Sequence, residues 1–290
     1  MGTTDVTIIG CGLMGSAVAR AIAAASYDLT VWNRTPEKAR ALQGDRILPV
    51  ASLQEAIDAS PRVLVVVSTY QDALDAFRDV AGWEGKAVVN VGSSAPAEVD
   101  VFGEWAGAVG ARYLDGAILV YPNEIGTSSG RAVFSGPADV WKDFEGVLAT
   151  LGAGVAYVSG NVRSASVLDV AAVGAFFTSS VTAYLEAAGY AKACGIGPRE
   201  LLATCEPLLD ILRSDMQGLT EALLSDGYES DQVTVATYAA ATRSFLQAMR
   251  GAGQRARHVE AAVASLDAAE SAGYEDLGLY SLVRVTSVDA

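Results

Sequence analysis

Three glycines near the amino terminus have the spacing of a phosphate-binding loop. Gly10, Gly12 and Gly15 follow an apolar, β-branched segment and precede an alanine-rich segment typical of a helix. In that context the first glycine permits a tight turn, the second lets the backbone approach a pyrophosphate, and the third lets helix and strand pack closely. The unpaired N–H groups of the helix start then face the anion. The loop predicts dinucleotide binding by Gly10, Gly12, Leu13, Met14 and Gly15.

The turn after the second predicted strand bears on which dinucleotide is bound. NAD-specific sites place an acidic residue here, to accept a hydrogen bond from the ribose 2′-hydroxyl. This chain has Asn33, followed by Arg34, Thr35 and Lys38. A carboxylate would repel a 2′-phosphate, whereas a guanidinium and a hydroxyl bind one. These four residues favour NADPH/NADP as the cofactor, the alternative being a solvated basic turn.

Polar residues also follow two later predicted strands. Ser68 and Thr69 follow one of them, and Asn90, Ser93 and Ser94 follow the next. Open α/β sheets hold their ligands at the carboxyl ends of strands, so all five are candidate cofactor-binding residues. The alternative for Ser93 and Ser94 is to cap the helix expected after Pro96.

The elements that must position these residues alternate between strands and helices. Such alternation indicates βαβ units and a mostly parallel sheet, an α/β fold of the Rossmann type. The predicted strands are Val6–Ile9, Leu29–Trp32, Val63–Val67, Ala87–Val91, Tyr113–Leu114, Ala132–Ser135 and Val155–Val158. The predicted helices between them are Ser16–Ala25, Pro36–Leu42, Leu53–Ala59 and Ala97–Ala108.

After Gly160 the pattern becomes entirely helical. We therefore expect a NADP-binding Rossmann domain at residues 1–160 and an all-helical domain for substrate binding and dimerisation at residues 161–290. An alanine-rich stretch from Ser164 to Cys194 predicts a long interdomain helix, and ~30 helical residues span ~45 Å. Its surface is apolar nearly all round, so several sides must be buried. A partner subunit is the simplest source of that burial, which predicts a homodimer with interleaved helical domains.

Composition excludes several other classes of protein. The 290 residues are 51% hydrophobic and carry a formal charge of −14, which argues against a nucleic-acid partner. His258 is the single histidine, and three scattered cysteines form neither a disulfide framework nor a zinc site, so we expect no metal. We expect no targeting signal and no membrane span, because the apolar stretch between Asp169 and Glu186 is short and contains hydroxyl residues. The expected location is cytoplasmic.

Taken together, the motifs resemble the β-hydroxyacid dehydrogenase superfamily, with its 6-phosphogluconate dehydrogenase-like fold. They are most similar to its imine reductase and reductive aminase branch, and the resemblance covers nearly the whole chain. The motifs that carry it are Gly10–Gly15, Asn33-Arg34-Thr35, Asn90–Pro96, Leu114–Ile118 and the long helix.

The start of the long helix separates the branches of this superfamily. The hydroxyacid dehydrogenases carry a catalytic lysine there, and this chain has Ser166 at the matching position. The resemblance instead implies that Asp169 is the catalytic residue. A lysine stabilises the oxyanion formed from a carbonyl but would repel an iminium ion, which a carboxyl group can hold or protonate. Apolar neighbours should raise the pKa of Asp169. The alternative is an exposed aspartate favoured by the helix dipole.

The implied activity is NADPH-dependent reduction of cyclic imines or iminium ions to amines, with reductive amination of ketones by small amines as a second reaction. An apolar substrate pocket is expected, in which Tyr238 would come from the partner subunit. Its candidates are Val120, Leu168, Val173, Phe176, Phe177 and Tyr238. Three alternatives stay open: a β-hydroxyacid dehydrogenase, a pyrroline-carboxylate reductase, and a non-catalytic NADP(H)-binding redox sensor.

Overall fold

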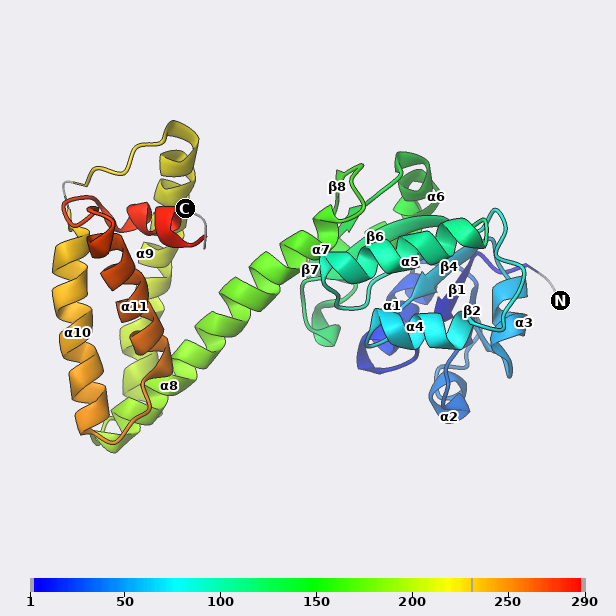
Figure 1. Ribbon diagram of the computed structural model, residues 1–290. Helices are drawn as coiled ribbons and strands as arrows, with labels where there is room; N and C mark the ends of the chain where they lie inside the picture. Colours follow the sequence, from blue (N-terminus) through cyan, green and yellow to red (C-terminus); the bar gives the residue numbers. More distant parts are fainter. Residues whose placement is uncertain (1–2, 231, 288–290) are drawn as a thin grey trace. The chain divides into compact units, whose positions relative to one another are not determined.

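The computed structural model describes residues 3–230 and 232–287. The chain divides into two compact units, the first ending at Phe176 and the second beginning at Phe177 (Figure 1). This division falls inside the long helix, later in the chain than the boundary at residue 160 that the change of pattern predicts.

The described residues of the first unit form an eight-stranded sheet with the order β3-β2-β1-β4-β5-β6-β7-β8. Only the β6–β7 pair is antiparallel. The strands are β1 (Val6–Ile9), β2 (Leu29–Trp32), β3 (Ile47–Pro49), β4 (Arg62–Val65), β5 (Ala87–Asn90), β6 (Arg112–Ile118), β7 (Thr127–Ser135) and β8 (Gly152–Ser159). Because β1 lies between β2 and β4, the strand order reverses there, and such switch points bind ligands in open α/β sheets.

Helices cover both faces of this sheet, and Figure 1 shows α4 and α5 in front of the strands. Alternate residues of one strand enter different cores: Ile8 packs with residues of α1 and α6, and Ile9 with residues of α3, α4 and α5. This two-sided burial is why the strands are almost continuously apolar. The helices are α1 (Leu13–Ala24), α2 (Pro36–Arg40), α3 (Leu53–Asp58), α4 (Tyr70–Phe77), α5 (Pro96–Ala108) and α6 (Ala138–Leu148).

The predicted long helix extends from Ser164 to Ala193. It consists of α7 (Ser164–Asp169), a π-helical segment (Val170–Thr178) and α8 (Ser179–Ala193). By length and composition alone it is long and apolar enough to cross a membrane, since an 18-residue stretch of it has a mean hydropathy of 1.4. The short apolar stretch between Asp169 and Glu186 is therefore not sufficient reason to exclude a membrane-spanning helix. The core helix of a soluble protein passes the same test.

Among its described residues, the second unit contains helices, their connections and one isolated β-bridge between Thr234 and Gly278, so its regular elements are helical as the sequence predicts. After α8 come α9 (Pro198–Ser225), α10 (Val235–Gly251), α11 (Arg257–Ser271) and a final 3₁₀ turn (Leu279–Val285). The helices α10 and α11 lie side by side (Figure 1), and they bury a small apolar core that includes Val235, Ala239 and Leu266.

Candidate functional site

The glycine loop joins β1 to α1 in the geometry that its spacing predicts. Gly10 has a φ of +103°, and a Cβ there would clash with the carbonyl oxygen of Val66. A Cβ on Gly15 would clash with the carbonyl oxygen of Gly10, so the helix packs directly against the turn. At Gly12, by contrast, a Cβ would meet nothing within 4 Å. The open side of the loop is thus the side that a phosphate must approach.

The turn after β2 holds this loop in place. The Cys11 N–H donates to Asn33 Oδ1 at 2.8 Å, and Asn33 Nδ2 donates to the carbonyl of Thr35 at 3.0 Å. The Asn33 side chain therefore connects the two predicted cofactor segments. It shapes the site in addition to lining it, a role that its position alone does not reveal.

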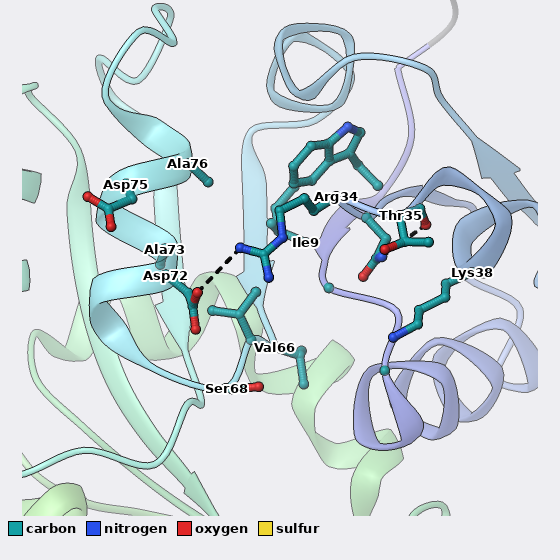
Figure 2. A pocket seen from close by; sticks show the side chains of 15 residues that line it. Ile9, Arg34, Thr35, Lys38, Val66, Ser68, Asp72, Ala73, Asp75 and Ala76 are labelled. Atoms are coloured by element: carbon teal, nitrogen blue, oxygen red, sulfur yellow. Dashed lines mark hydrogen bonds and ion pairs between the residues drawn. The ribbon is translucent and has the colours of Figure 1, made fainter.

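Both segments line a cavity of about 400 Å³ at the carboxyl ends of β1, β2 and β4 (Figure 2). This volume is within the range of ligand pockets. Of the predicted cofactor residues, the cavity brings together Gly10, Gly12, Asn33, Arg34, Thr35, Lys38 and Ser68. Leu13 is exposed beside it, whereas Gly15 is buried behind it and Met14 packs against the core.

Helix α4 adds two carboxylates that the sequence analysis does not include. Asp72 and Asp75 line the cavity, and Figure 2 shows the Arg34 guanidinium turned toward Asp72. In this ion pair, Arg34 Nη1 and Asp72 Oδ1 are 3.5 Å apart. Thr69, a predicted cofactor residue, is the N-cap of α4: its hydroxyl accepts the Asp72 N–H at 3.1 Å. The sequence Thr69-x-x-Asp72 is the signal that would have revealed this helix start.

The loop after β5 contains the remaining cofactor candidates. Asn90 is fully buried, and its Oδ1 accepts the Gly92 N–H at 3.1 Å, so its side chain shapes this loop. Ser93 is exposed, and Ser94 is half-buried. The N-cap of α5 is Ala95, whose N–H donates to Glu98 Oε2 at 2.8 Å. Neither serine caps α5, so the alternative role of Ser93 and Ser94 as helix caps is excluded.

Asp169 is the last residue of α7, directly before the π-helical segment. Single stretches of π-helix occur frequently at functional sites. The carboxyl group is half-buried, and burial raises the pKa of Asp169. This agrees with the expectation of a desolvated carboxyl group and not with an exposed aspartate in the first helical turn.

The residues predicted to line the substrate pocket belong to both units of the chain. Val120 is half-buried against the core of the first unit, while Leu168 and Phe176 expose 40% and 45% of their surface. Val173 is half-buried. Phe177 and Tyr238 belong to the second unit, where Tyr238 lies on α10. The role of all six in substrate binding stays a prediction.

A buried polar cluster was not expected. Tyr70, Tyr113 and Asp115 bond one another beneath the loop after β5. An aspartate among the apolar residues that follow Arg112 in β6 is the available signal, since an unpaired buried carboxylate is rare.

Two family models together span almost the whole chain. Residues 5–160 match the model described as the NAD binding domain of 6-phosphogluconate dehydrogenase. Residues 161–288 match the model described as the C-terminal domain of NADPH-dependent reductive aminase-like proteins.

Individual relatives agree with these matches. An NADPH-dependent reductive aminase of Aspergillus oryzae (strain ATCC 42149 / RIB 40) is 26% identical over 234 residues, which are 80% of this chain and 77% of the relative. A solved reductive aminase of Aspergillus terreus, in complex with NADPH4, cyclohexanone and allyl amine, is 26% identical with a TM-score of 0.91, covering 98% of this chain and 100% of that one. An imine reductase of Myxococcus stipitatus in complex with NADP⁺ is 25% identical with a TM-score of 0.92, covering 97% and 99%.

Proposed function

We propose that this chain, which belongs to the imine reductase and reductive aminase family of the β-hydroxyacid dehydrogenase superfamily, reduces C=N bonds with NADPH. Its substrates would be cyclic imines or iminium ions, and ketones together with small amines. The observation that carries the proposal is Asp169: the long helix presents a half-buried carboxyl group and has no lysine before Lys192.

The residues of the first unit fit NADPH. The pyrophosphate would lie over Gly12 at the start of α1, where the loop is open. Arg34, Thr35 and Lys38 would hold the 2′-phosphate, because they line the same cavity. When bound, NADPH supplies the hydride. The chain itself has to orient the C=N bond and manage its proton and charge.

Asp169 would both donate the proton and stabilise the positive charge. With a neutral imine, the protonated acid gives its proton to nitrogen while carbon receives the hydride, and an amine forms. With an iminium ion, the carboxylate holds the cation, and the hydride converts it to a neutral amine. A pKa raised by burial keeps the acid form available closer to neutral pH than for an exposed aspartate.

A substrate panel tests this function. We expect the purified protein to oxidise NADPH with 1-pyrroline-type imines, and with cyclohexanone plus allyl amine. Oxidation of small 3-hydroxy acids with NADP⁺ should be much slower, because no lysine stabilises the oxyanion. Absorbance at the NADPH band measures both directions. Preferred turnover of hydroxy acids would support the dehydrogenase alternative, and NADPH binding with no turnover would support the sensor.

We also propose that the protein is a homodimer whose helical units cover each other. Large apolar side chains are exposed along α8, α9 and α10, and a soluble monomer rarely exposes so extended a patch. They are Val181, Leu185, Leu202, Leu208, Leu209, Ile211, Leu212, Met216, Leu223, Leu224 and Phe245. A second copy would cover them.

Light scattering at micromolar concentration should give twice the chain mass of 30.0 kDa. Leu209→Glu should shift the protein toward monomer, because a charge would be buried at the interface. Leu48→Glu is the matched control, since Leu48 is also exposed but lies on β3. Monomeric wild-type protein, or wild-type protein that floats with lipid vesicles, would contradict the homodimer.

A further inference from the structure

Asp115 is a buried carboxylate in the middle of the sheet. It lies on β6 with 1% of its surface exposed. Its Oδ1 accepts hydrogen bonds from the hydroxyls of Tyr113, at 2.9 Å, and Tyr70. Its Oδ2 accepts the backbone N–H of Ser166, at 3.1 Å. The carboxylate therefore joins two tyrosines to the helix that carries Asp169.

Nothing in the packing of β6 requires a charge at this position. Asp115 takes part in none of the ion pairs formed by the described residues. Burial raises the pKa of Asp115 to about 6, although the bonds from Tyr70 and Tyr113 act to lower it. A buried carboxylate without a cation destabilises the fold, and an apolar residue would avoid that cost. Asp115 contacts the start of α7, which indicates a structural role at this helix.

The role of Asp115 is to hold the first turn of α7 in place. The Ala165 N–H donates to Ser135 Oγ at 2.8 Å, and the next N–H, that of Ser166, donates to Asp115. These are among the N–H groups that a helix start leaves without partners. Side chains of β6 and β7 thus attach the helix start to the sheet. Ser166 is three residues, less than one helical turn, before Asp169.

The same network reaches the loop after β5. The ring of Tyr70 lies against this loop, because a Cβ on Gly92 would be only 3.5 Å from Tyr70 Cδ2. The Ser94 side chain interacts with the Tyr70 hydroxyl and lowers the pKa of Tyr70, against the larger effects of burial and of Asp115. Tyr70 in turn donates to Asp115. The path is Ser94 to Tyr70 to Asp115, which also accepts the Ser166 N–H.

We propose that Tyr70 and Asp115 are positioning residues for C=N reduction, which couple the loop after β5 to the helix of Asp169. This inference rests on the proposed function and on Ser94 lying beside the bound cofactor. A cofactor that orders the loop would then also order the first turn of α7. Such coupling matters because small displacements of a reacting group lower rates strongly.

Two matched variants test the coupling. Tyr70→Phe and Tyr113→Phe each remove one buried hydroxyl that bonds Asp115 Oδ1, but of the two tyrosines only Tyr70 interacts with Ser94 in the loop after β5. We expect Tyr70→Phe to lower kcat about 10-fold, because it removes the bond to Asp115 and also the link from Asp115 to the loop after β5. Tyr113→Phe should lower kcat by less than about 3-fold. The Kd for NADPH should change little in either variant.

A double-mutant cycle and a conservative replacement separate positioning from plain stability. Ser94→Ala and Tyr70→Phe should lower kcat non-additively, since they interrupt one path. Asp115→Asn keeps an oxygen that can accept the Ser166 N–H, so it should retain more activity than Asp115→Ala. A merely structural role predicts equal kcat for the two tyrosine variants whenever their melting temperatures fall equally, and that result would overturn the inference.

Hydrogen exchange gives a readout that needs no turnover. NADP⁺ should slow amide exchange at residues 163–169 in the wild type and in Tyr113→Phe, but not in Tyr70→Phe. Equal slowing in all three proteins, or no slowing in the wild type, would overturn the inference. This slowing pattern in a protein that reduces no imine would support the coupling and reject the proposed function, so the two failures are distinguishable.

Discussion

Asp169→Asn is expected to lower kcat for imine reduction by about 100-fold or more, the usual contribution of a general acid. Asparagine has nearly the same shape but cannot donate the proton and carries no charge to hold an iminium ion. Asp169→Ala should lose at least as much. Steady-state NADPH oxidation with a cyclic imine measures the loss, and fluorescence titration should show that the Kd for NADPH is unchanged.

A second carboxyl replacement controls for the change of charge. Asp45 is exposed in the loop before β3, so Asp45→Asn alters net charge equally and should leave kcat within about 2-fold. If Asp169→Asn and Asp169→Ala turned over like the wild type, Asp169 would have no part in the chemistry. A loss of NADPH affinity in step with kcat would assign Asp169 to cofactor binding.

The acid role also fixes the direction of the pH dependence. Burial raises the pKa of Asp169, so the protonated form is present below that pKa and is lost as the pH rises through it. With a neutral imine, kcat should therefore fall on the alkaline side, and Asp169→Asn should not show that fall. A rate that instead rose with pH through this range would indicate a general base.

The parts of the fold that the sequence predicts are those with strong local patterns. Strands such as β1 and β2 are short runs rich in β-branched and apolar residues, and their predicted bounds are confirmed. The short edge strand β3 was not predicted, because its three residues end in Pro49, which resembles a turn. Helix α6 was also not predicted, although Val140, Phe144, Val147 and Leu148 have helical spacing.

The residues of the site also divide into those that the sequence predicts and those that it does not. The glycine loop and the Asn33–Thr35 turn are contiguous in the sequence, so their joint presence in the cavity is predictable. Asp72 and Asp115 are not, because they reach the site only through sheet order: β4 lies beside β1, and β6 lies beside β5. No local spacing encodes that adjacency. For Asp115, the sequence could indicate only that a carboxylate interrupts an apolar part of a strand.

Arg34→Ala is expected to weaken NADPH binding by about 10- to 100-fold while changing NADH binding by less than about 3-fold. The loss corresponds to one or two charge-assisted hydrogen bonds to a 2′-phosphate, a group that NADH lacks. Arg34 is 85% exposed at its side chain, so removing it should not destabilise the fold. Fluorescence titration with each cofactor measures both values. Equal weakening for NADPH and NADH would place Arg34 against the adenosine and not the 2′-phosphate.

Replacement of Asp72 is expected to have the opposite effect on NADPH binding from replacement of Arg34. Its Oδ1 lies 3.5 Å from Arg34 Nη1, so it competes with a 2′-phosphate for the guanidinium and adds negative charge to the cavity. Asp72→Asn should therefore tighten NADPH binding by up to about 5-fold, as expected when one exposed ion pair no longer competes. In the Arg34→Ala background the same replacement should have a smaller effect, because the competition is gone and only the general repulsion remains. An unchanged gain in that background would mean that Asp72 acts on the phosphate directly, independently of Arg34.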